Sequence, residues 1–256
     1  MHISGVSARN LSKIVEELCE KSVSKSLVSS LTERLDPMVN AWQNRLLLGM
    51  NYPYLMTDVL YLKVREDHGV LSKSCHIAIG ITEDGEREVI RFMIQNEESN
   101  NTWSTFFEYL KERGLQRTEL MISDALKEFV SAIRKSFTKA SWQRCQVHFL
   151  KNIFTILPKK NSKSFREAVK AIFKLTDINL ARAAKNNIVD EYIQQPKYKI
   201  ACETLDNGFD DAFQYIVTGN VYDQLKSSNL LERLNQEVRR REKSFVSSPI
   251  ELQPID

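Results

Sequence analysis

Three consecutive segments of alternating apolar and polar residues, all between positions 54 and 95, constrain the fold more than any other feature of the sequence. They read YLMTDVLYLKVRE, SCHIAIGIT and REVIRFMIQ, and the last two are separated by EDGE. Alternation with a period of two predicts strands with one buried face. Gly85 permits a tight turn between the second and third segments. The sequence therefore predicts an antiparallel meander of three strands.

The chain from residue 100 to residue 158 alternates between helical and strand patterns. Apolar residues at helical spacing predict helices over 102–113, 125–137 and 147–157, and short apolar segments predict strands over 119–123 and 140–145. Three antiparallel strands followed by helix, strand, helix, strand and helix is the order of a ribonuclease H-like α/β fold. We therefore expect one mixed sheet covered by helices.

Helical patterns flank this core on both sides. Residues 7–34 predict two short helices with a turn between them, which matches either a helix-turn-helix or a helical hairpin of a bundle. A further helix is expected over 35–50, and the pattern is again helical beyond residue 159, where the polar breaks PKKNSKS and QQPKYK bound an all-helical insertion. The expected organisation is a helix-turn-helix region with a linker helix (1–48), a ribonuclease H-like core (50–158), the helical insertion (159–218), a C-terminal core helix (219–243) and a disordered tail (244–256).

Composition narrows the class of protein. The net charge is only +3, so any surface for nucleic acid must come from local clustering of cations. The four cysteines form no C-x-x-C pair, which argues against a disulfide framework and against a four-thiolate zinc site. The sequence has neither an apolar segment of membrane-spanning length nor a signal-peptide pattern. We therefore expect a cytoplasmic protein with no membrane association.

Two aspartates stand out within the predicted core. Asp58 falls in register with Met56 and Leu60 on the strand face expected to be buried, where a carboxylate needs a cationic partner or a metal ion. Asp124 ends the fourth predicted strand and could simply cap the helix that follows. In a ribonuclease H-like sheet, however, the first and fourth strands are neighbours. The two carboxylates would then repel each other unless a divalent cation lay between them.

Glu232 is a candidate third carboxylate, at the head of the segment SSNLLERLNQEVRRREK. On a helical wheel it shares a face with amide and basic side chains, while the leucines and Val238 lie on another face. The alternative is an exposed glutamate among surface charges. Three such carboxylates could hold two Mg²⁺ or Mn²⁺ ions, which activate a water or a 3′-hydroxyl against a phosphodiester. The predicted backbone-contacting residues of this helix are Asn235, Gln236, Arg239 and Arg240.

Cys145 and His148 form a C-x-x-H pair at a predicted strand-to-helix junction. No second pair lies at zinc-finger spacing, so the pair does not predict a zinc site. A packed cysteine beside a hydrogen-bonded histidine and a role near DNA both remain open. Further side chains suited to phosphates or base edges are Arg144 and Lys151 beside this pair, and Lys25, Ser29 and Arg34 in the predicted helix-turn-helix.

Four segments together resemble the bacterial Mutator-like insertion-sequence transposases, which are DDE transposases. They are GVSARNLSKIVEELCEKSVSKSLVSSL, YPYLMTDVLYLKVRE, LMISDALKEFVSAIRKSF with WQRCQVHFLKNI, and SSNLLERLNQEVRRRE. The resemblance implies that Asp58, Asp124 and Glu232 are the catalytic metal ligands, and that Cys145 and His148 are a family signature. It also implies metal-dependent strand cleavage and strand transfer at the terminal inverted repeats of an insertion sequence, with paired ends and target DNA held by a dimer or larger complex on the bacterial nucleoid.

The chain differs from members of this family at both ends. Family members begin well before the helix-turn-helix and continue past the basic helix, whereas the resemblance here ends near Lys243. We therefore expect a chain truncated at both ends. Two alternatives remain: a catalytically inactive DNA-binding remnant of a transposase, and a different ribonuclease H-like nuclease such as a junction resolvase, which would prefer branched DNA.

Overall fold

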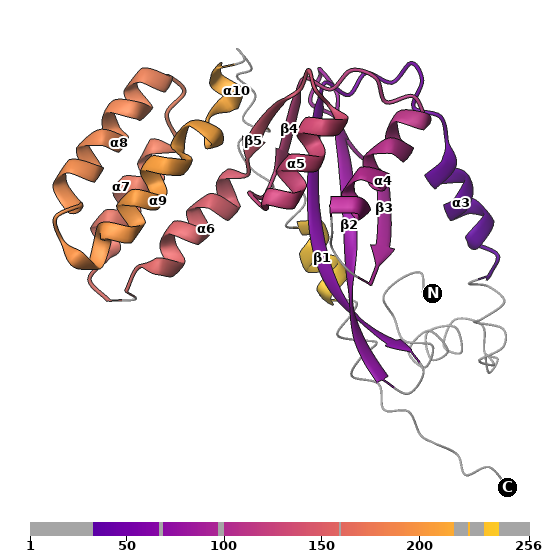
Figure 1. Ribbon diagram of the computed structural model, residues 1–256, viewed down its shortest axis with the longest axis horizontal. Helices are drawn as coiled ribbons and strands as arrows, with labels where there is room; N and C mark the ends of the chain where they lie inside the picture. Colours follow the sequence, from indigo (N-terminus) through magenta and orange to yellow (C-terminus); the bar gives the residue numbers. More distant parts are fainter. Residues whose placement is uncertain are drawn as a thin grey trace, which may run out of the picture.

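The computed structural model describes residues 33–66, 69–96, 100–158, 160–217, 225 and 233–240. Residues 1–32 of the predicted helix-turn-helix region, including Lys25 and Ser29, lie outside the described residues, and so do Glu232 and residues 241–256. The described chain forms one mixed sheet with helices on both faces and a group of helices to one side (Figure 1).

The five-stranded sheet consists of β1 (Tyr54–Glu66), β2 (Gly69–Ile81), β3 (Arg87–Gln95), β4 (Leu120–Ser123) and β5 (Ser141–Arg144). Its strand order is β3-β2-β1-β4-β5. The first three strands pair antiparallel, β4 pairs parallel with β1, and β5 pairs parallel with β4. The predicted meander and the ribonuclease H-like mixed sheet are therefore confirmed.

The strand bounds follow from the hairpin between β1 and β2. Both strands have 13 residues and pair along their whole length, from Tyr54↔Ile81 to Glu66↔Gly69. β1 and β3 have the predicted bounds. β2 begins at Gly69, five positions before the predicted start, because its first residues pair with the end of β1 although they lack a buried alternating face.

One face of the sheet is covered by α4 (Asn100–Glu112) and α5 (Lys127–Ser136). Trp103 of α4 is 1% exposed and lies edge-on to Phe129 of α5, with 4.0 Å between ring centroids. β1 and β2 contribute Leu55 and Ala78, both fully buried, to the same cluster. This aromatic layer fixes the two helices against the strand that carries Asp58.

The opposite face packs against α6 (Gln146–Ile156) and a helix over residues 233–240. Met56 and Leu60 of β1, which are 2% and 1% exposed, belong to this cluster, and Leu234 and Val238 pack against it. Beyond α6 lie α7 (Lys163–Ile172), α8 (Ile178–Tyr192) and α9 (Pro196–Ala212), followed by the short α10 (Gln214–Val217) (Figure 1).

Two helical predictions need correction. The segment QQPKYK is a break only at its two glutamines, which lie between α8 and α9, because α9 begins at Pro196 and runs without interruption to Ala212. Proline is compatible with the first turn of a helix, where its missing N–H is not needed. The helix predicted over 35–50 is α3 (Asp36–Asn44), which ends earlier. Its Met38 is 66% exposed, whereas Trp42 stacks on Phe92 at 5.9 Å.

The end of α9 also differs from the prediction. The helical pattern expected through the end of the insertion is interrupted at Phe213, between the end of α9 and the start of α10. Phe213 is fully buried and stacks on Phe209 with 4.6 Å between ring centroids.

Among the described residues, none of the helices combines the length and the apolar character needed to traverse a lipid bilayer.

Candidate functional site

The site lies at a notch in the sheet, where β1 continues past the end of β4. The pairing of these two parallel strands covers Tyr54 to Met56 opposite Leu120 to Ile122, and β4 ends at Ser123. The same register continued by two residues places Asp58 level with Asp124. The strand-length difference therefore brings together the two aspartates that the sequence singled out, at an edge that β4 no longer covers.

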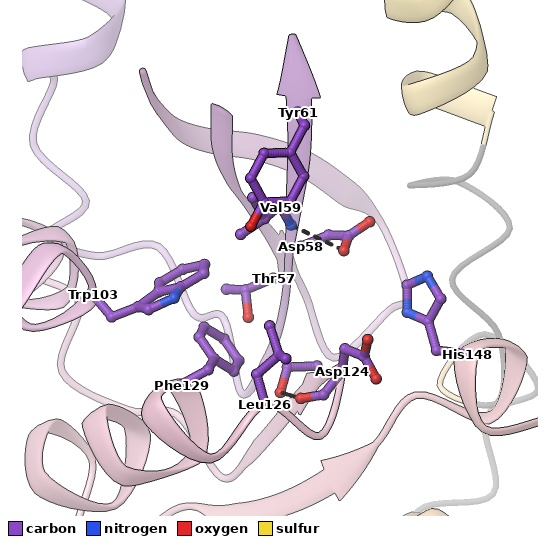
Figure 2. Close-up of a pocket in the computed structure, with 10 residues that line it drawn as sticks. Thr57, Asp58, Val59, Tyr61, Trp103, Asp124, Leu126, Phe129 and His148 are labelled. Carbon is purple, nitrogen blue, oxygen red and sulfur yellow. Dashed lines mark hydrogen bonds between the residues drawn. The ribbon is translucent and has the colours of Figure 1, made fainter. Parts of the chain in front are cut away.

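A pocket of about 250 Å³ opens at this notch. Figure 2 shows the carboxylates of Asp58 and Asp124 and the imidazole of His148 around one space, with Trp103 and Phe129 on the far side of β1. The polar groups come from β1, the end of β4 and the first turn of α6, whereas the apolar wall comes from α4 and α5. The lining is completed by Thr57, Val59, Tyr61, Ser123 and Leu126.

Asp58 is half-buried, and both of its carboxylate oxygens accept hydrogen bonds. Its Oδ1 accepts a hydrogen bond from the backbone N–H of Val59 at 2.9 Å, and its Oδ2 accepts one from Nδ2 of Asn235 at 2.7 Å. Burial raises the pKa of Asp58 above its usual value, and the charge of Asp124 adds to this, whereas His148 and the two hydrogen bonds oppose it. Asp58 lies on the same face of β1 as the buried Met56 and Leu60, as the alternation predicts.

Asp124 is not the N-cap of α5. That helix begins at Lys127, and Leu126 occupies its N-cap position without a side-chain hydrogen bond. The Oδ1 of Asp124 instead accepts a hydrogen bond from the backbone N–H of Ala125 at 2.8 Å. The capping alternative considered from the sequence is therefore wrong, and the second carboxylate oxygen stays on the side of the pocket (Figure 2).

The C-x-x-H pair links the core to the pocket. Cys145 is 3% exposed at the N-cap position of α6, and its backbone N–H donates to the carbonyl of Ser123 at 2.7 Å. This bond fixes the start of α6 against the end of β4, beside Asp124. His148 follows one helical turn later and lines the pocket. The two residues thus have different surroundings although they are three positions apart.

The electrostatics of His148 reflect this placement. Its pKa is raised to about 9, chiefly by a hydrogen bond with Cys145 and further by the charges of Asp58 and Asp124, although burial opposes the rise. A protonated imidazole therefore offsets part of the carboxylate charge. Among the described residues there is no cluster of three or more His, Cys, Asp or Glu side chains suited to a metal ion.

Asn235 occupies a position that sequence reasoning did not foresee. We expected it to contact a DNA backbone, but in the structure its amide is hydrogen-bonded to Asp58, 177 positions earlier in the chain. Its Oδ1 is buried and has no hydrogen-bond partner among the described residues. The helical wheel places Asn235 on the same face as Glu232. This shared face is the one feature of the sequence that could have indicated that Asn235 lies near the carboxylates.

The other predicted DNA contacts differ in exposure. Arg144 is half-buried: its guanidinium carbon lies 4.4 Å from the centroid of the Phe149 ring, and burial lowers its pKa. Arg240 donates two hydrogen bonds to Glu237, at 2.8 and 2.7 Å. The remaining described candidates, all exposed, are Arg34, Lys151, Gln236 and Arg239.

Comparison with known proteins places these features in context. The family described as "Transposase, Mutator family" matches residues 1–251, eight positions beyond Lys243, where the resemblance seen in the sequence ends. Over 243 residues the chain is 76% identical to the transposase for insertion sequence element IS256 in transposon Tn4001 of Staphylococcus aureus, covering 95% of this chain and 62% of that protein.

More distant relatives carry similar names. The transposase for insertion sequence element ISRM5 of Rhizobium meliloti is 35% identical, covering 94% of this chain and 60% of that protein. The transposase for insertion sequence element IS1081 of Mycobacterium tuberculosis is 33% identical, covering 94% of this chain and 58% of that protein. The chain therefore spans about three fifths of the length of the curated relatives it matches.

Proposed function

Because the chain belongs to the Mutator family of transposases, we propose that it cleaves DNA strands at the ends of an insertion sequence and transfers them to target DNA. The observation that carries this proposal is the juxtaposition of Asp58 and Asp124 at the notch between β1 and β4, around one pocket. Two carboxylates at one open edge are suited to metal-dependent phosphodiester chemistry, which needs no side-chain nucleophile.

We infer that Asp58, Asp124 and Glu232 hold two divalent cations. The donor chemistry fits, because carboxylate oxygens are the ligands that Mg²⁺ and Mn²⁺ prefer. Burial is the main cause of the raised pKa of Asp58, and the charge of Asp124 adds to it, so a bound cation would stabilise the ionised form of this poorly solvated carboxylate. When bound there, Mg²⁺ or Mn²⁺ would supply an activated water or 3′-hydroxyl and stabilise the leaving oxygen.

The assignment of Glu232 rests on the family resemblance and on Asn235. Residues three apart in a helix share a face. Asn235 follows Glu232 by three positions and contacts Asp58 directly. The side of this segment that bears the amide therefore faces the proposed ligands, which supports Glu232 as the third of them.

The remaining side chains of the pocket position and insulate the carboxylates. The amide of Asn235 and the N–H of Val59 each hold one oxygen of Asp58, which limits rotation of that carboxylate. Protonated His148 balances negative charge on the opposite side of the pocket. Trp103 and Phe129 form a wall that excludes water behind β1.

The proposed partner is double-stranded DNA. The relatives are named for insertion sequences, which have two ends, so we propose that two copies of the chain or more act together on paired ends. The predicted helix-turn-helix, with Lys25, Ser29 and Arg34, would recognise the terminal repeat, and Gln236 and Arg239 would contact the strand near the cut. These reactions would take place in the bacterial cytoplasm, where the nucleoid lies.

A cleavage assay on labelled element ends tests this proposal. Asp58→Asn, Asp124→Asn and Glu232→Gln should each abolish cleavage in Mg²⁺ or Mn²⁺ while DNA binding persists. Glu128→Gln, which neutralises an exposed carboxylate on α5, is the matched control and should cleave normally. Normal cleavage by any of the three variants would remove that residue from the site. A wild-type chain that binds ends but never cuts them would be a non-catalytic DNA-binding protein.

A further inference from the structure

Positive charge is concentrated in one segment of the chain. Residues 141–175 contain eight lysines and arginines and a single acidic residue, Glu167, although the net charge of all 256 residues is only +3. In the structure this segment forms β5, α6 and α7. A local excess of this size marks a surface for a polyanion far better than the overall charge does.

The charged segment encloses a groove of about 460 Å³ between α6 and α7. Its floor is apolar and includes the ring of Phe154. The centroid of this ring lies 5.1 Å from the guanidinium carbon of Arg166 and 5.6 Å from the ammonium nitrogen of Lys170. Arg166 is fixed by hydrogen bonds to the carbonyl of Phe154 and to Ser162, both at 2.9 Å. The other lining residues are Val147, Leu150, Lys151 and Thr155.

The cations of this groove are not neutralised within the described part of the chain. There, the segment's one ion pair joins Lys163 to Glu167 at 3.9 Å, and it involves neither Lys151 nor Lys170. The neighbouring helices differ, because Arg182 and Lys185 of α8 are paired with Asp210 and Asp206 of α9. The ammonium groups on the α6–α7 side are therefore available to an external anion.

The groove adjoins the carboxylate pocket along α6. His148 lines the pocket, whereas Lys151 and Thr155 line the groove. These three residues are spaced at i, i+3 and i+7, so they lie on one face of the helix. The distance along the axis from His148 to Thr155 is about 10 Å at 1.5 Å per residue. A strand that leaves the pocket along this face would reach the basic groove within a few nucleotides.

We propose that the α6–α7 groove binds the phosphate backbone of duplex DNA beside the scissile position. Lys151 and Lys170 supply the phosphate contacts, and the apolar floor supports their aliphatic stems. The inference rests on the proposed function, because it takes the pocket to be the place where DNA is cut. Contacts of this kind hold DNA of any sequence, so the groove adds affinity and alignment to whatever recognises the element end.

The test measures binding without cleavage. Affinity of the full chain for a duplex of random sequence is measured by fluorescence anisotropy in EDTA, at salt concentrations between about 50 and 200 mM. The variant is Lys151→Gln with Lys170→Gln, and the control is Lys139→Gln with Lys199→Gln, which removes the same charge from exposed positions outside the groove. Because the groove variant can no longer neutralise two phosphates, its slope of log affinity against log salt should decrease by about 1.8. The control should keep the wild-type slope.

The outcomes separate this inference from the proposed function. A groove variant with the wild-type slope and affinity overturns the inference, even if Asp58 proves essential for cleavage. A reduced slope in the groove variant supports the groove, even if the wild-type chain never cuts DNA. Unchanged DNA binding together with weaker binding of a labelled acidic peptide would assign the groove to a protein partner and overturn the DNA assignment. Circular dichroism of each variant checks that α6 and α7 are intact.

Discussion

The hydrogen bond between Asn235 and Asp58 yields the sharpest prediction, through the variant Asn235→Ala. The substitution removes the donor that lies 2.7 Å from Oδ2 of a buried carboxylate. A hydrogen bond to a charged group contributes roughly 1.5–3 kcal/mol, so we expect the free energy of unfolding at pH 7 to fall by about 2 kcal/mol. Of its hydrogen bonds to described residues, Asp58 would keep the one from the Val59 N–H, at 2.9 Å.

The same substitution changes proton and metal binding. The Asn235 bond lowers the pKa of Asp58 against the larger effect of burial, so its loss raises that pKa further. A raised folded-state pKa destabilises the fold above the unfolded-state pKa, and the effect vanishes below it. The difference between wild type and variant should therefore be largest near pH 7 and smaller near pH 4. Divalent cations need the ionised carboxylate, so half-maximal cleavage should require more Mg²⁺ in the variant.

The measurement is urea unfolding in EDTA at both pH values. Gln236→Ala is the matched control, because Gln236 is exposed on the same helix and should change stability by less than about 0.5 kcal/mol. If Asn235→Ala and Gln236→Ala were equally stable at pH 7, the bond to Asp58 would contribute nothing in solution. The role we give Asn235 in positioning Asp58 would then be refuted.

Three further predictions concern the helices and the pocket. Gly208→Ala should lower stability by about 1–3 kcal/mol in thermal unfolding, since its Cβ would lie 2.6 Å from both Arg144 Nη1 and the Phe149 ring; a higher melting temperature would contradict this packing. Asp177→Ala should cost about 1 kcal/mol, because Asp177 accepts hydrogen bonds from the N–H groups of Asn179 and Leu180 at the start of α8; Asp177→Asn should retain most of that stability. In metal-free protein the imidazole of His148 should titrate by NMR near pH 9, and the stability from its charge should be complete below about pH 6.5 and lost as pH rises through 9. Titration near 6.5 would contradict the contact with Cys145.

The strands were predictable because their signal is local. Alternation along 54–66 and 87–95 gave the bounds of β1 and β3, since side chains on a strand point to opposite faces in turn. The start of α9 was not predictable in this way. Two glutamines followed by Pro196 are typical of a loop, and the glutamines do lie between α8 and α9. Pro196, however, already begins the helix whose Tyr198 and Cys202 pack in the core.

The site was predictable in part. Asp58 could be identified because a carboxylate on a buried strand face needs a partner, and Asp124 because its strand neighbours the first in this topology. The partner of Asp58 could not be identified, since helical periodicity gives the face of Asn235 but not what that face meets. The split of Cys145 and His148 between core and pocket likewise depends on how α6 is set against β4.

The distance along the chain between Asp58 and Asn235 also sets the order in which the site can form during synthesis. The ribosome adds 177 residues after Asp58, and Asn235 is the last of them. At roughly 5–20 residues per second this takes about 9 to 35 seconds. The elements from β2 to α10 are all synthesised within that interval. A nascent chain therefore carries the Asp58 carboxylate without its amide partner until the segment that bears Asn235 has been made.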